Sequence, residues 1–163
     1  MPKENIEKVI NIYTDGGCSG NPGPGGFGVA AFQNDKLIYE YNKMCSNTTN
    51  NREELKAILH AFELSQTIYK NNICYINSDS AYCVNICNNW IFNWYNNNWK
   101  RSKGKDIENL DLIKSLYKYI TLDFFNCQVI KTKGHANILG NELADALATN
   151  NIRKINEIKN QLC

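Results

Sequence analysis

The 163-residue sequence has no apolar run approaching the roughly 20 residues that a membrane-spanning helix needs, so we expect no membrane partner. Its polar, acid-containing first residues exclude a secretory signal, and we expect a cytoplasmic, intracellular protein. An excess of one charge is also missing, because 18 Lys and Arg residues face 16 Asp and Glu, a net charge of +2. That total neither requires nor excludes a nucleic-acid partner.

Metal-binding cysteine motifs are missing as well. Seven cysteines are present, an odd number, and no two have Cys-x-x-Cys spacing. Only two histidines, His60 and His135, are available to join them. This pattern argues against a structural zinc site and favours free, mostly buried thiols in a reducing compartment. The sequence also lacks a serine–histidine or cysteine–histidine pattern of the kind that would indicate a covalent nucleophile.

What is present is the patterning of one α/β domain over residues 1–163. Apolar runs joined by short connections predict an antiparallel meander, with strands at 8–14, 27–32 and from 37 onward. Helical spacing and further apolar runs then alternate: helices at about 52–69, 80–90 and 108–120, strands at 73–77 and 127–131, and a final helix from Asn141. Residues 16–26, rich in glycine and proline, predict a loop. The order predicts a mixed sheet with helices packed on it.

Four acidic residues lie at the ends of these elements. Asp15 follows the first strand and Asp79 the fourth, and these strands are the expected neighbours where the sheet changes from antiparallel to parallel. Glu54 lies in the first turn of the first helix, and Asp145 in the first turn of the last. Four carboxylates around one sheet edge repel one another, which favours hard divalent cations as counter-ions. Two such ions about 4 Å apart can clamp a phosphodiester.

Each acid alone also has a structural interpretation. Asp15, with the glycine after it, has the composition of a turn, and Asp79 could cap a helix. Asn51 and Glu54 have the spacing of a capping box, and Asp145 would suit the positive end of a helix dipole. Their common position at one sheet edge favours a metal site over these alternatives.

Short motifs surround these acids, at 13–16 (YTDG), 20–26 (GNPGPGG), 49–55 (TNNREEL), 77–82 (NSDSAY), 90–99, 133–136 (KGHA) and 141–145 (NELAD). In this order and spacing they resemble type 1 ribonuclease H over about residues 9–149. The resemblance implies a ribonuclease H-like α/β fold, whose five-stranded mixed sheet has three antiparallel strands, then parallel ones, and helices on both faces. Many family members have a separate hybrid-binding domain, but only about eight residues precede the first strand here, so we expect a single catalytic domain without one, and a monomer.

The activity implied is endonucleolytic hydrolysis of the RNA strand of RNA–DNA hybrids, leaving 5′-phosphate and 3′-hydroxyl ends. The resemblance assigns two Mg²⁺ ions per site, with Mn²⁺ as a substitute, to Asp15, Glu54, Asp79 and Asp145. The family's catalytic histidine corresponds to His135, which we expect to act in acid–base chemistry or product release rather than in metal binding. His60 is interpreted as structural or exposed.

The RNA strand is distinguished by its 2′-hydroxyl groups. The resemblance assigns contacts with it to Cys18, Ser19, Asn21 and Asn50, with Asn51 in the same substrate-binding set. The glycine-rich segment is expected to let the backbone approach the RNA closely. Ala81 departs from the family, some members of which have a longer polar side chain there.

The DNA strand is expected to contact Thr49, Tyr82, Trp90, Trp94 and Asn109, with Thr49 and Asn109 forming a phosphate pocket. A helix core stripe is the alternative for the tryptophans, and it is strongest for Trp99. The stretch 100–105 carries four positive charges, on Lys100, Arg101, Lys103 and Lys105. We expect a basic protrusion that binds phosphates in a salt-dependent way, with a solvated loop as the alternative.

Two other functions remain open on the residues alone. One is a non-catalytic nucleic-acid-binding module on the same fold, although such a module has no need of all four acids. The other is a transposase- or resolvase-like DNA nuclease with a related core. Such nucleases lack the combination of a glycine-rich RNA-facing segment with Thr49-Asn50-Asn51.

Overall fold

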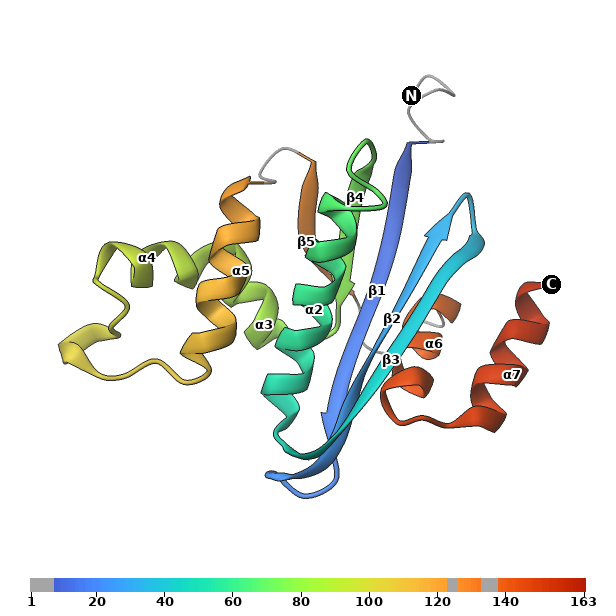
Figure 1. Ribbon diagram of the computed structural model, residues 1–163, viewed down its shortest axis with the longest axis horizontal. Coiled ribbons are helices and arrows are strands. Elements are labelled where there is room, and N and C mark those ends of the chain that lie inside the picture. The colour runs from blue at the N-terminus through green and yellow to red at the C-terminus, as the bar shows by residue number, and fades with distance from the viewer. Residues whose placement is uncertain (1–7, 123–125, 133–137) are drawn as a thin grey trace.

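A computed structural model describes residues 8–122, 126–132 and 138–163 of the chain. Five strands form one mixed sheet in the order β3-β2-β1-β4-β5 (Figure 1). The antiparallel meander consists of β1 (Val9–Cys18), β2 (Gly23–Gln33) and β3 (Lys36–Thr48). Strands β4 (Ile73–Ser78) and β5 (Cys127–Lys131) extend the sheet in parallel from β1. The predicted fold class is confirmed.

Helices cover both faces of the sheet (Figure 1). Helix α2 (Asn50–Gln66) packs on β1 and β2 from one face, with α5 (Leu110–Leu122) beside it. Helix α6 (Leu139–Ala148) packs on β1 and β2 from the other face, with α7 (Ile152–Leu162) behind it. Between β4 and α5 the chain forms α3 (Ala81–Asn85), a π-helical turn (Ile86–Trp90), α4 (Ile91–Asn96) and a 3₁₀ turn (Ser102–Gly104).

The alternation of side chains along β2 divides the interior into two cores. Phe27, Val29 and Ala31 face the larger core beneath α2 and α5. Ala30 and Phe32 face the smaller core beneath α6 and α7. The sheet is therefore a central layer with a packed core on each face, and this packing fixes the positions of the residues at the strand ends.

The segment 16–26 differs from the predicted loop. Strand β1 continues to Cys18 and β2 begins at Gly23, so that Gly16 pairs with Phe27 and Cys18 with Gly25. Turn propensity favoured a loop, but antiparallel pairing overrides it here because glycines fit where other backbone atoms come close. A Cβ atom at Gly26, for example, would lie 2.9 Å from the carbonyl oxygen of Ala148.

The cysteines match the expectation that they form no disulfide. All seven lie in the described residues and none is in a disulfide, and Cys74, Cys83, Cys87 and Cys127 are buried. Within the described part of the chain, no helix combines the length and apolar character required to cross a membrane.

Candidate active site

The parallel register of β1 and β4 brings two acids to the same place. Thr14 of β1 pairs with Ser78, the last residue of β4, and the residue after each of them is an aspartate, Asp15 and Asp79. Asp15 lies inside β1 rather than after it, so the turn interpretation is wrong. Asp79 does not cap α3, because the side chain of Ser80 accepts the hydrogen bond from the Cys83 N–H at 3.2 Å.

Glu54 reaches these aspartates because α2 lies very close to β1. A Cβ atom at Gly16 would stand 2.6 Å from the carbonyl oxygen of Glu53, so only glycine allows this approach. The helix is capped by Thr49, whose hydroxyl accepts from the Arg52 N–H at 3.3 Å. The capping-box interpretation of Asn51 and Glu54 is therefore wrong. Glu54 lies in the second turn and is only 8% exposed.

Asp15, Glu54 and Asp79 form a tight acidic cluster. One carboxylate oxygen from each residue lies within 4.8 Å of the others. Burial, followed by the charge of Asp79, raises the pKa of Asp15 to about 7. Burial, followed by the charges of Asp15 and Asp79, raises the pKa of Glu54 further. Burying charged carboxylates side by side without a counter-ion is unfavourable in free energy. A bound cation would offset this unfavourable free energy through its positive charge.

One atom of the cluster also lacks a partner. Glu54 Oε2 is buried and makes no hydrogen bond within the described residues. Buried polar atoms are normally paired, so an unpaired oxygen on a carboxylate that lies close to two others fits a site for a hard divalent cation.

Asp145 lies beside this cluster but not in it. Helix α6 begins at Leu139, earlier than predicted, so Asp145 occupies its second turn and the helix-dipole interpretation is wrong. The Asp145 side chain is 54% exposed, and it comes close enough to Asp15 to contribute to the raised pKa of that residue. On its other side, Asp145 Oδ2 lies 3.8 Å from Lys154 Nζ of α7. No local sequence pattern indicates this ion pair.

The two histidines have different outcomes. His135 lies outside the described residues, so its role stays a prediction. His60 is half-buried on α2, where its ring stacks on Tyr41 at 4.4 Å and its Nε2 lies 2.7 Å from Tyr39 Oη. Burial lowers the pKa of His60. These contacts agree with a structural interpretation of His60.

The residues predicted to face RNA are joined by hydrogen bonds. The Cys18 N–H donates to Asn50 Oδ1 at 2.8 Å, and the Asn50 N–H donates to Asn21 Oδ1 at 3.0 Å. Ser19 and Asn51 are exposed nearby. Gly16 and Gly26 are packed against other protein atoms, whereas a Cβ atom at Gly17 would meet only Asn50 Oδ1, at 3.7 Å. Close approach of this segment to RNA stays a prediction.

Thr49 and Asn109, the predicted phosphate pocket, are connected by a residue that sequence reasoning did not single out. Arg52 donates its backbone N–H to Thr49 and its guanidinium to Asn109 Oδ1 at 3.3 Å. The same guanidinium holds both oxygens of Asp111, at 3.0 and 2.9 Å, and keeps the pKa of that carboxyl below its usual range. Arg52 thereby fixes the start of α2 against the start of α5.

The predicted aromatic contacts form one row. The rings of Tyr82 and Trp90 lie 5.9 Å apart, and those of Trp90 and Trp94 6.1 Å apart. Trp90 is 38% exposed. Trp99 faces a different neighbour, since it packs edge-on against Tyr117 of α5 at 5.4 Å. Trp99 lies beyond the end of α4 and, like Trp94, is partly buried against the larger core, so it packs on the core without being part of a helix stripe.

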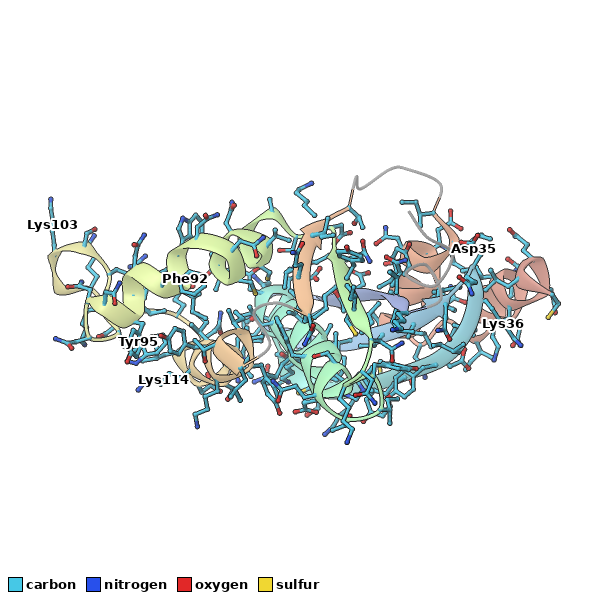
Figure 2. The ribbon with its side chains drawn as sticks, turned by 90° about the horizontal axis from the view of Figure 1, so that it is seen from above. Asp35, Lys36, Phe92, Tyr95, Lys103 and Lys114 are labelled. Atoms are coloured by element: carbon cyan, nitrogen blue, oxygen red, sulfur yellow. The ribbon has the colours of Figure 1, made fainter. Side chains whose placement is uncertain are left out.

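The basic segment (residues 100–105) is exposed throughout and projects from the sheet together with α4 (Figure 1). A backbone hydrogen bond from the Arg101 N–H to the Lys105 carbonyl closes it into a turn. Lys100 pairs with Asp106 at 2.6 Å, which partly balances its charge. Figure 2 shows Lys103 at the extreme end of the molecule, pointing away from it.

The chain matches one protein family along most of its length. A family model described as RNase H matches residues 7–153. A ribonuclease H of Caldanaerobacter subterraneus subsp. tengcongensis is 41% identical over 157 residues, covering 93% of this chain and 95% of the relative. A ribonuclease HI of Pasteurella multocida is 42% identical over 145 residues, covering 88% of this chain and 89% of the relative.

A solved structure gives the same result for the fold. LC9-RNase H1, described as a type 1 RNase H with the type 2 active-site motif, superimposes with a TM-score of 0.74 and 27% identity. The match covers 88% of this chain and 71% of that one. Sequence and structure agree that the chain belongs to the type 1 ribonuclease H family.

Proposed function

We propose that this chain is an endonuclease that hydrolyses the RNA strand of RNA–DNA hybrids and leaves 5′-phosphate and 3′-hydroxyl ends. Its family supports hydrolysis of RNA in hybrids. The observation that carries the proposal is the meeting of Asp15, Glu54 and Asp79, from three separate elements, within 4.8 Å. No structural requirement of β1, α2 or β4 explains three converging carboxylates.

The acids are proposed to hold two Mg²⁺ ions, or Mn²⁺ in their place. When bound, such ions supply positive charge to the phosphodiester, an activated water and stabilisation of the leaving oxygen. Asp15, in β1, and Asp79, directly after the adjacent strand β4, provide the fixed side of this site. Glu54 provides a buried oxygen with no partner of its own among the described residues. Asp145, half-exposed on α6, is the ligand with the most freedom to adjust.

Proton transfer is proposed to involve His135. Its position in the sequence, shortly before α6, would allow an imidazole to exchange protons with the leaving group or to assist product release. Since the carboxylates are committed to the metal, a separate titratable group near neutral pH suits this role.

Selection of the RNA strand is proposed to occur at the end of the β1–β2 hairpin. The linked groups of Cys18, Asn21 and Asn50 form a short polar surface that offers donors and acceptors to 2′-hydroxyls. Ser19 and Asn51 extend this surface. Asn50 also lies at the start of α2, four residues before Glu54, so RNA binding and the acidic cluster share one helix.

The DNA strand is proposed to lie along the opposite side of this helix start. Thr49 and Asn109, connected through Arg52, would hold a phosphate, and the row of Tyr82, Trp90 and Trp94 would contact sugars. The basic segment adds affinity through its positive charges, mainly those of Arg101, Lys103 and Lys105, because Lys100 is paired with Asp106.

We further propose that the 163 residues act as one catalytic domain, as a monomer, in the cytoplasm. Seven cysteines without a disulfide among them suit a reducing compartment. Sedimentation at several protein concentrations tests the oligomeric state, and a single species at the mass of one chain is the expected result.

One assay tests the proposed activity against both alternatives. Labelled RNA–DNA hybrid, double-stranded RNA and double-stranded DNA are each incubated with the protein in Mg²⁺, Mn²⁺ or chelator. We expect cleavage of the hybrid alone, within the RNA strand, and only with metal. Hybrid binding without cleavage in either metal would indicate a binding module, and cleavage of double-stranded DNA would indicate a DNA nuclease.

A further inference from the structure

Helix α7 is held firmly against α6, the helix that carries Asp145. Ile155 and Ile158 are buried, 8% and 2% exposed, in the small core beneath α6. The side chain of Asn151 caps the helix by accepting from the Lys154 N–H at 3.1 Å. At the far end, Lys159 pairs with Glu40 of β3 at 2.8 Å. The position of the Lys154 backbone is therefore fixed from three sides.

The ammonium group of Lys154 lies close to Asp145, the one of the four predicted metal ligands that is outside the tight cluster. Its Nζ is 3.8 Å from Asp145 Oδ2, and both side chains are about half exposed. Asp145 in turn is close enough to Asp15 to raise the pKa of that residue. Lys154, Asp145 and Asp15 thus form a chain of charges that leads from α7 into the site.

The stability of α7 does not explain this lysine. Cations in the first turn of a helix are unfavourable because they face the positive end of the helix dipole. Arg153 and Lys154 both lie in that turn, which contains no acid. Arg153 is compensated by Glu157 at 3.1 Å along the helix, whereas the carboxylate that Lys154 meets is Asp145.

We infer that Lys154 is a positioning residue that acts as the counter-ion of Asp145 and lowers the affinity of the site for divalent cations before substrate binds. The inference rests on the proposed role of Asp145 as a metal ligand. The ammonium group competes with an incoming cation for the same carboxylate and repels that cation directly. The negative phosphates of a hybrid would offset this charge, so the effect should be largest in the protein without substrate.

The size of the effect follows from exposure. Ion pairs between half-exposed groups contribute little, because water and salt screen them. Removing the charge should therefore tighten Mg²⁺ binding by about two- to fivefold at low ionic strength. The difference should shrink when KCl is raised to about 0.5 M, where the Debye length is a few ångströms.

The test uses the full chain with Lys154→Ala, Lys154→Gln and Lys154→Arg. Arg153→Ala is the matched control, because it removes a neighbouring first-turn charge that pairs with Glu157 instead. The readout is the rise in Tm as MgCl₂ is titrated without substrate at constant ionic strength, from which the Mg²⁺ affinity follows. A parallel titration follows hybrid cleavage against Mg²⁺ concentration.

We expect tighter Mg²⁺ binding for Lys154→Ala and Lys154→Gln, and affinity near that of the original protein for Lys154→Arg and Arg153→Ala. Unchanged or weaker binding in Lys154→Ala, or a Lys154→Arg variant that behaves like Lys154→Gln, would overturn the inference. Failure of the proposed function would look different: the original protein would show neither Mg²⁺ stabilisation nor hybrid cleavage.

Discussion

A Cβ atom on Gly16 would lie 2.6 Å from the carbonyl oxygen of Glu53, closer than a side chain can come to a neighbouring backbone. The glycine that follows Asp15 in the sequence is therefore what lets α2 press against β1. This contact brings the carboxylate of Glu54 to those of Asp15 and Asp79. The position of the acidic cluster depends on an absent side chain as much as on the acids themselves.

Replacing Gly16→Ala should displace α2 from the sheet. We expect a loss of about 1–3 kcal/mol in the free energy of unfolding from overpacking, and a loss of hybrid cleavage larger than the loss of stability explains. Urea denaturation and cleavage assays on the same samples measure both. Gly17→Ala is the control for stability, since a Cβ there meets only Asn50 Oδ1 at an ordinary 3.7 Å. Equal, small effects of the two substitutions would contradict the role given to Gly16.

The acidic cluster should make the metal-free protein sensitive to pH. Burial and neighbouring charges raise the pKa of Glu54 to about 10, whereas an unfolded glutamate titrates at about 4.3. Between these values the folded protein holds a proton that the unfolded chain has released. In chelator, the contribution of Glu54 to the free energy of unfolding should therefore be most favourable below about pH 4.3. It should become less favourable as the pH rises toward 10.

Glu54→Gln tests this dependence. In chelator at pH 8 the variant should have a higher Tm than the original protein, by about 3 °C for each kcal/mol gained, and a flatter pH profile. With Mg²⁺ the difference in Tm should become smaller or change sign, because the cation stabilises the original acidic cluster more than that of the variant. A variant that is less stable in chelator at pH 8 would show that the carboxylates do not repel one another as the geometry indicates.

Lys103 at the tip of the basic segment should contribute affinity without sequence preference. Lys103→Ala should weaken hybrid binding and reduce the slope of log Kd against log salt concentration by up to about one. Lys36→Ala is the matched control, because Figure 2 shows Lys36 toward the opposite end of the molecule from Lys103. Anisotropy titrations at several KCl concentrations give both slopes. Identical slopes for the two variants would rule out phosphate contact by the tip.

Trp90 and Trp99 should respond in opposite ways to truncation. Trp90→Ala should raise the Kd for hybrid about tenfold with little change in stability, because the ring is 38% exposed beside Trp94. Trp99→Ala should instead lower the free energy of unfolding by about 2–4 kcal/mol, since that ring packs on Tyr117. Binding and urea denaturation distinguish them. A stability loss confined to Trp90→Ala would reverse the two assignments.

The approach of Asp15 to Asp79 could be predicted from the sequence because it follows from topology. Strands separated by a helix pair in parallel, and acids at matching strand positions then meet. The register of Thr14 with Ser78 satisfies this expectation. Predictions from local composition were less accurate where tertiary contacts determine the backbone conformation. The segment 16–26 has the composition of a loop, yet pairing across the hairpin makes most of it strand.

Helix boundaries and long-range contacts could not be predicted from the sequence. The spacing of Asn51 and Glu54 suggested a capping box, but the residue that caps the helix is Thr49, two residues before Asn51. Nothing in the local sequence indicates that Lys154 reaches Asp145, because the contact depends on how α7 packs behind α6. Residues brought together by strand order are predictable, while those brought together by helix packing require the structure.

The substitution Asp15→Asn tests the central claim most directly, because it removes one charge from the acidic cluster while keeping the size of the side chain. Cleavage of labelled RNA–DNA hybrid in Mg²⁺ and hybrid affinity are measured on the same preparation. We predict that cleavage falls to the detection limit while the Kd for hybrid stays within a few-fold of the original value. Cleavage at a rate near that of the original protein would contradict the assignment of the acidic cluster as the catalytic centre.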